Sequence, residues 1–127
     1  MLKEKKILIV DDDERNIFAL SAVLRSKGPE LIVARDGREC LDMLNNNNDV
    51  DIILMDMMMP VMDGYETIKE IRKTDKLKHH KIICLTAQAM IGDKEKCLAA
   101  GADDYSTKPV DVDELLLKIG NLLSKKN

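Results

Sequence analysis

The sequence predicts an α/β fold, a doubly wound five-stranded parallel sheet with five helices. Four apolar runs of about four residues recur along the chain with little alternation of polar positions, as is typical of strands buried on both faces. The segments between these runs place their apolar residues at helical spacing. Strands and helices that alternate with short connections form right-handed crossovers, and therefore a doubly wound sheet.

Five segments are predicted to be strands. The first four are the apolar runs, and the fifth is a weaker segment that follows Gly101. A tract of asparagines at 45–48 is interpreted as a polar loop before the third strand. The predicted strands cover residues 7–10, 31–34, 52–55, 82–85 and 104–107.

Five segments are predicted to be helices. The first follows Asp13, whose residue type caps helix N-termini, and the fourth precedes Gly101, whose residue type ends helices. The last carries a stripe of Leu and Ile and ends at Lys125 and Lys126, where the helix dipole favours cations. This helix is expected to reach the end of the chain, with no output domain after it. The patterns that indicate the five helices lie at 14–26, 40–44, 68–72, 94–100 and 115–123.

The composition is that of a single folded domain over residues 1–127. Apolar residues make up 45% of the chain and charged residues 34%, so the chain can bury a core. The formal charge of -3 provides no positive field for a phosphate backbone, and no direct binding of nucleic acid is expected. No apolar run is long enough to cross a bilayer or to form a secretory signal, so we expect a cytoplasmic location without membrane contact.

Several chemically notable residues are interpreted as structural. An odd number of cysteines without CxxC spacing indicates small buried hydrophobic residues rather than disulfides or zinc ligands. The methionines within 55–62 are interpreted as loop and core packing. His79 and His80 lie in a basic segment before the fourth strand and are interpreted as part of a solvated, charged loop. The cysteines are Cys40, Cys84 and Cys97.

Carboxylates follow two strands that are expected to be neighbours. Asp11 and Asp12 come directly after the first strand, and Asp56 comes directly after the third. Ligands bind at the carboxyl ends of the strands in such sheets, where these side chains would meet. Like charges brought together take up protons or bind a cation, and ligands that are all oxygen select Mg²⁺ before Zn²⁺. Asp13 is instead expected to cap the first helix.

A hydroxyl and an ammonium are expected at the same edge of the sheet. Thr86 follows the fourth strand, and Lys108 follows the fifth. Together with carboxylates and a divalent cation, these groups can stabilise a phosphoryl group in transfer. One carboxylate can then act as the nucleophile and become an aspartyl phosphate.

The chain resembles a response-regulator receiver domain of two-component signalling, of the chemotaxis-regulator type. The resemblance rests on four motifs in the order and spacing of that family, and it covers essentially the whole sequence. The segment AMIGDKEKCLAAGADDYSTKP is similar to receivers of hybrid histidine kinases. The resemblance implies a flavodoxin-like receiver fold. The four motifs are ILIVDDD, LMDMMMPVMDGYE, LTAQA and DDYSTKP.

The resemblance also implies a role for each acidic residue. Asp56 would be the phosphoacceptor, and Asp12 would bind Mg²⁺ directly. Asp11 would contact the metal mainly through water, and the backbone carbonyl of Met58 would be a further ligand. The expected cofactor is therefore Mg²⁺, with Mn²⁺ as a possible substitute.

The remaining roles concern phosphoryl recognition and switching. Lys108 would pair with the phosphoryl oxygens, and its bond to Pro109 is expected to be cis. Thr86 would move to bond the phosphoryl group, and Tyr105 would change position in response. The surface of the fourth helix, fifth strand and fifth helix would then change its affinity for a downstream protein that the sequence does not identify. The phosphoryl donor would be a histidine kinase or a histidine phosphotransfer protein.

Two residues are expected to tune hydrolysis of the acyl phosphate. Met58 and Gln88 each lie two positions beyond a site residue. In receivers, these side chains flank the path of the attacking water. Our hypothesis is that Met58 impedes this water while Gln88 helps to orient it.

The sequence leaves alternatives open. A small phosphatase-like enzyme could use Asp56 as its nucleophile, although 127 residues leave little room for a cap or a second acid. A flavin-binding module could share the strand order, but the acidic segment DDDERN is a poor phosphate cradle. A phosphorylation-independent scaffold of the same fold is a third alternative. We do not expect an enzyme, although the chain would assist its own phosphorylation and dephosphorylation. The sequence leaves open whether it is a stand-alone regulator or a fragment of a hybrid histidine kinase.

Overall fold

The structure is a computed structural model, and it describes residues 2–47, 49–59, 62–87 and 92–124. Strands and helices alternate along the chain, as the sequence predicts. The strands are β1 (Lys6–Val10), β2 (Glu30–Ala34), β3 (Ile52–Asp56), β4 (Lys81–Thr86) and β5 (Asp104–Thr107). The helices are α1 (Glu14–Arg25), α2 (Gly37–Asn46), α3 (Gly64–Lys73), α4 (Asp93–Ala100) and α5 (Val112–Ser124).

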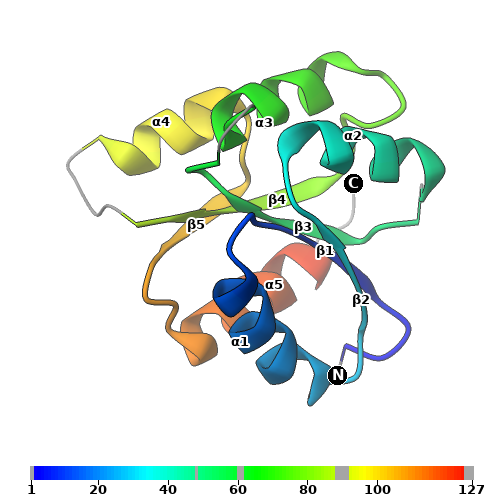
Figure 1. The fold of residues 1–127 in the computed structure, drawn as a ribbon, viewed down its shortest axis with the longest axis vertical. Helices are drawn as coiled ribbons and strands as arrows, with labels where there is room; N and C mark the ends of the chain where they lie inside the picture. Colours follow the sequence, from blue (N-terminus) through cyan, green and yellow to red (C-terminus); the bar gives the residue numbers. More distant parts are fainter. Residues whose placement is uncertain (1, 48, 60–61, 88–91, 125–127) are drawn as a thin grey trace.

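The five strands form one parallel sheet in the order β2-β1-β3-β4-β5. Helices α2, α3 and α4 cover one face of this sheet, and α1 and α5 cover the other (Figure 1). The predicted doubly wound α/β fold is confirmed. Because β1 and β3 are neighbours, with Val10 opposite Met55, their carboxyl ends meet at one place on the sheet edge.

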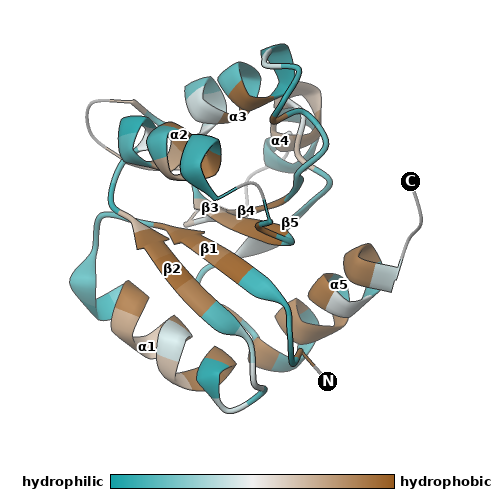
Figure 2. Cartoon of the chain, turned by 90° about the vertical axis from the view of Figure 1, so that its right-hand side faces the viewer, coloured by the Kyte–Doolittle hydropathy of each residue, from teal (hydrophilic) through white to brown (hydrophobic). Residues whose placement is uncertain are grey.

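Each face of the sheet has its own hydrophobic core, because alternate residues of a strand point to opposite faces. In β1, Leu8 and Val10 pack toward α2, α3 and α4, whereas Ile7 and Ile9 pack toward α1 and α5. Hydrophobic strands therefore lie between two layers of helices (Figure 2). This double burial explains why the strands are apolar runs rather than alternating ones.

Aspartates cap the N-termini of four helices. The side chain of Asp13 accepts hydrogen bonds from the N–H groups of Arg15 and Asn16, which confirms the predicted cap of α1. Asp36, Asp63 and Asp111 cap α2, α3 and α5 in the same way. Each carboxylate satisfies N–H groups that have no partner within the helix and lies at the positive end of its dipole.

The structure changes some predicted boundaries by single residues. Strands β3 and β4 include Asp56 and Thr86, and α1 ends at Arg25, one residue before the predicted end. The lysines expected at the end of α5, Lys125 and Lys126, lie outside the described residues. All three cysteines are buried, as expected. No helix among the described residues is long and apolar enough to cross a membrane.

The interpretation of His80 as part of a solvated loop is wrong. Its side chain is buried, with 2% of its surface exposed, and its Nδ1 lies 3.1 Å from the carbonyl oxygen of Val50. Because a carbonyl only accepts, Nδ1 carries the proton. Leu77 is buried beside the same connection, so this short segment packs onto the core instead of extending into water. His79 is exposed, as expected.

Candidate functional site

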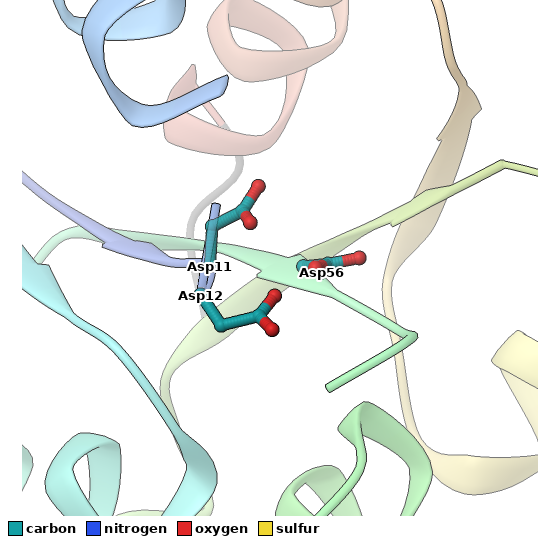
Figure 3. Close-up of side chains that lie close together, drawn as sticks. All are labelled: Asp11, Asp12 and Asp56. Carbon is teal, nitrogen blue, oxygen red and sulfur yellow. The ribbon is translucent and has the colours of Figure 1, made fainter. Parts of the chain in front are cut away.

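Three carboxyl groups meet where β1 and β3 end. Asp11 and Asp12 follow β1 directly, and Asp56 is the last residue of β3. One carboxylate oxygen from each residue lies within 4.8 Å of the others (Figure 3). The cluster predicted from the strand ends is therefore present, and its donors are all oxygen.

The backbone holds two of these carboxylates in place. Oδ1 of Asp11 accepts the N–H of Asp13 at 2.9 Å, and Oδ1 of Asp56 accepts the N–H of Met58 at 3.2 Å. Asp11 and Asp56 are buried, whereas Asp12 is exposed. The cluster thus combines two buried carboxylates with one that is open to water.

Lys108 brings a positive charge to the same cluster. Its Nζ lies 3.2 Å from Oδ1 of Asp56 and 3.5 Å from Oδ2 of Asp11. The bond from Lys108 to Pro109 is cis, as the resemblance implies. The backbone N–H of Lys108 donates to the carbonyl oxygen of Thr86 at 2.7 Å, which joins the ends of β4 and β5.

The site is short of positive charge. Burial raises the pKa of Asp56 to about 6, and the neighbouring charge of Asp11 raises it as well. The N–H of Met58 and the ammonium of Lys108 oppose this rise without cancelling it. Three carboxylates around one lysine therefore favour a proton or a divalent cation as an additional positive partner. The donor set fits a hard cation such as Mg²⁺.

The two residues expected to form the switch lie on neighbouring strands. Thr86 ends β4, is buried, and pairs in register with Thr107 of β5. Tyr105 lies two residues earlier in β5, opposite Cys84, and packs partly buried against the core beneath α2, α3 and α4. A strand pair thus connects Thr86 at the site to Tyr105.

The structure describes only one of the two residues that are expected to tune hydrolysis. Met58 follows the site, and 65% of its surface is exposed while its N–H stays bound to Asp56. Gln88 lies outside the described residues. The other described methionines of this segment, Met55, Met57, Met59 and Met62, are buried or partly buried, as their interpretation as packing residues requires.

One residue beside the predicted switch was missed from the sequence. Lys118 of α5 places its ammonium 5.0 Å from the centre of the Tyr105 ring. The sequence signal was the Glu114–Lys118 pair one helical turn apart, which indicates an exposed ion pair and nothing about β5. Only the packing of α5 on the sheet shows what Lys118 contacts.

The arrangement is suited to phosphoryl transfer. A buried carboxylate provides a nucleophile, and an ammonium together with a site for a divalent cation can offset the charge of the transferred group. A hydroxyl ends the neighbouring strand. Asp12 and Met58 beside the buried carboxylates are both exposed to solvent.

Comparison with known proteins identifies the family. Residues 7–120 match the response regulator receiver domain, and the chain belongs to this family. It is thus a receiver domain of two-component or phosphorelay signalling.

Three relatives illustrate the range of proteins that carry this domain. The response regulator DivK of Brucella anthropi is 34% identical over 94% of this chain and 96% of its own length. The transcriptional regulatory protein CpxR of Escherichia coli is 38% identical over 96% of this chain and 50% of its own length. The hybrid signal transduction histidine kinase I of Dictyostelium discoideum is 37% identical over 84% of this chain and 6% of its own length. The chain therefore spans half or less of the length of the last two.

Solved structures agree with this assignment. A putative response regulator from Chloroflexus aurantiacus has a TM-score of 0.91 and 36% identity, covering 97% of this chain and 100% of that chain. A receiver domain of a Pseudomonas aeruginosa sensor histidine kinase, with a magnesium ion in its active-site cleft, has a TM-score of 0.87 and 36% identity, covering 95% and 98%. A Saccharomyces cerevisiae receiver domain in complex with a histidine phosphotransfer protein has a TM-score of 0.86 and 30% identity, covering 96% and 90%. These similar proteins are signalling modules rather than classical enzymes.

Proposed function

We propose that this chain is a phosphoacceptor, in which Asp56 takes a phosphoryl group from the phosphohistidine of a histidine kinase or a histidine phosphotransfer protein. The observation that carries the proposal is the meeting of three carboxylates and Lys108 at the carboxyl ends of neighbouring strands. The yeast receiver domain in complex with a phosphotransfer protein supports this class of donor.

In the transfer, an oxygen of Asp56 attacks the phosphorus atom while the bond from phosphorus to the partner's imidazole nitrogen breaks. The electron pair of that bond stays on the imidazole, which takes up a proton as needed. Lys108 lies within 3.2 Å of the Asp56 carboxylate, so its ammonium also lies next to an attached phosphoryl group. The hydroxyl of Thr86 donates to another phosphoryl oxygen.

A divalent cation completes the charge balance. Asp11, Asp12, Asp56 and the backbone carbonyl of Met58 would hold Mg²⁺, with Mn²⁺ as a substitute. When bound, the cation neutralises charge on the phosphoryl oxygens. The magnesium in the Pseudomonas aeruginosa receiver domain supports this choice.

The consequence of phosphorylation is a changed surface. Movement of Thr86 toward the phosphoryl group lets Tyr105 change position, which alters the surface formed by α4, β5 and α5. This surface then binds or releases a downstream protein. The chain promotes its own phosphorylation and dephosphorylation, and it acts in the cytoplasm as one domain over residues 1–127.

The test is the intact mass of the protein after incubation with acetyl phosphate, which donates a phosphoryl group and leaves as acetate. We expect one added phosphoryl group with Mg²⁺ and none with EDTA. Asp56→Asn should show no adduct, because the amide is not a comparable nucleophile. The matched control is Asp13→Asn, since asparagine also caps helices and Asp13 lies outside the carboxylate cluster.

Two outcomes would contradict the proposal. An adduct that persists in Asp56→Asn would place the phosphoryl group elsewhere. No adduct in the wild type, together with no binding of beryllofluoride in the presence of Mg²⁺, would leave the phosphorylation-independent scaffold. Beryllofluoride is required because it mimics the bound phosphoryl group without being hydrolysed.

A further inference from the structure

The ammonium of Lys118 lies among several groups of β5 and α5. It lies 2.9 Å from Oε1 of Glu114, 3.4 Å from Oγ of Ser106 and 3.9 Å from Oδ1 of Asp104. It also donates a hydrogen bond to the backbone carbonyl of Tyr105. The same nitrogen is 5.0 Å from the centre of the Tyr105 ring.

These contacts hold the cation against one face of the ring. Two negatively charged carboxylates, Asp104 on β5 and Glu114 on α5, balance the positive charge of Lys118. Only 20% of its side chain is exposed, so water competes weakly for the ammonium. A cation over a tyrosine ring is attracted by the negative face of the ring. Movement of Tyr105 would give up this attraction.

The second tyrosine shows what is particular about Lys118. Lys96 of α4 lies over the ring of Tyr65 of α3, with its Nζ 4.4 Å from the ring centre. Both tyrosines therefore have a lysine over the ring. Lys118 additionally binds the backbone carbonyl of the residue whose ring it covers, so both the backbone and the ring of Tyr105 contact α5.

We propose that Lys118 is a positioning residue that holds the Tyr105 ring in the place it has in this structure. Lys118 thereby opposes movement of the ring when the site is occupied. This inference rests on the proposed role of Tyr105 in the switch. Through Lys118, helix α5 would then set how readily Tyr105 moves when the site is occupied.

The test uses ¹⁹F NMR of protein labelled with 3-fluorotyrosine, because the chain has two tyrosines and gives two signals. Tyr65→Phe leaves the Tyr105 signal alone and so assigns both. In Lys118→Met, which keeps most of the aliphatic stem, we expect the Tyr105 signal of the ligand-free protein to shift while the Tyr65 signal stays. Titration with beryllofluoride and Mg²⁺ should reach its midpoint at a concentration about two- to fivefold lower, the lower end of the range for one cation–π contact.

Lys96→Met is the matched control, because it removes the same group from the other tyrosine. It should shift the Tyr65 signal and leave the Tyr105 signal and the midpoint unchanged. Lys118→Arg retains a cation over the ring and should restore both wild-type readouts. Glu114→Gln is a milder second variant on an exposed side chain, and it should shift the Tyr105 signal in the same direction by a smaller amount.

Unchanged Tyr105 signals in Lys118→Met and Glu114→Gln would overturn the inference, as would a midpoint that is unchanged or raised in Lys118→Met. A wild-type protein that does not bind beryllofluoride would instead contradict the proposed function. The ligand-free signals of the variants would still decide whether Lys118 positions the ring.

Discussion

The main chain and the side chain of Met58 have different roles at the site. Its N–H donates to Asp56 at 3.2 Å, while 65% of the residue is exposed next to the site. The thioether can neither accept a proton from water nor orient it strongly. We infer that Met58 shields the acyl phosphate from water, whereas Gln88, outside the described residues, helps to orient it.

Met58→Asn should accelerate loss of the phosphoryl group. An amide can hydrogen bond to the attacking water, and one such bond corresponds to a rate increase of about fivefold. The measurement is the rate of dephosphorylation after removal of acetyl phosphate, followed by intact mass. Leu117→Asn is the control, because Leu117 is equally exposed, at 65%, and lies on α5. Equal rates for Met58→Asn and the wild type would refute the shielding role.

Residues at strand ends were predictable, and residues brought together by packing were not. Asp11, Asp12 and Asp56 meet because parallel strands end at one edge, which the sequence pattern already indicates. Lys118 contacts Tyr105 through the packing of α5, which no spacing in the sequence predicts. His80 was misread because the surrounding lysines indicate a solvated loop and hide the buried contact of its ring with Val50.

At the scale of elements, Arg72 of α3 fixes the end of α4. Its Nε donates to the carbonyl oxygen of Gly101 at 2.8 Å, and its Nη2 bonds Oδ2 of Asp103 at 3.0 Å. Its Nη1 donates to the carbonyl oxygens of Lys78 and His80. One guanidinium therefore joins α3, the connection that precedes β4 and the connection from α4 to β5.

The end of α4 depends on glycine in this arrangement. Gly101 has a φ of 121°, and a Cβ there would lie 2.7 Å from Cγ of Arg72. We expect Gly101→Ala to lower the free energy of unfolding by about 1–3 kcal/mol, since it adds backbone strain to a close contact.

Gly120 provides the opposite control for this prediction. It lies inside α5, where an added Cβ meets no heavy atom within 4 Å. Gly120→Ala should raise the free energy of unfolding by about 0.5–1 kcal/mol, because alanine is the better helix former. Urea unfolding measures both variants. A Gly101→Ala protein as stable as the wild type would show that the contact with Arg72 relaxes at no cost.

The types and order of the elements were predictable because the apolar runs and the helical spacing follow from burial on two faces. The boundaries were less predictable. Asp56 and Thr86 continue β3 and β4 because the ladder extends past the last apolar residue, where the sequence pattern turns polar. Four helices are capped by aspartates, but only Asp13 was recognised from the sequence.

Across the whole molecule, two buried ionisable groups at opposite ends of the sheet respond to pH in opposite directions. Burial, with the charges of His79 and Arg72, lowers the pKa of His80 below its usual 6.5. Burial and Asp11 raise the pKa of Asp56 from 3.8 to about 6. As pH falls below 6.5, the unfolded chain takes up a proton at His80 first, so stability is lost. As pH falls from about 6 toward 4, the folded chain takes up a proton at Asp56 first, so stability is gained.

Removing His80 should therefore reveal the contribution of Asp56. In His80→Gln, we expect stability in metal-free buffer to rise more, or fall less, between pH 7.5 and pH 5 than in the wild type. Urea unfolding in EDTA at both pH values gives the difference, in which the other titrating groups cancel. His79→Gln removes the charge of the exposed neighbour but leaves His80 buried, so it should change the pH response less than His80→Gln does. Identical pH responses of His80→Gln and the wild type would show that the buried histidine is not linked to folding.

The contacts of Tyr105 have a consequence for how copies of the protein meet in solution. Strand β5 is at one edge of the sheet, where unpaired backbone groups invite a strand from another molecule. The N–H of Tyr105 donates to Oδ1 of Asp104, and its carbonyl accepts from Lys118, so side chains of the same chain satisfy both groups. An incoming strand would have to displace two charged groups to pair there. At Tyr105, the edge is thereby protected against strand addition and the aggregation that follows from it.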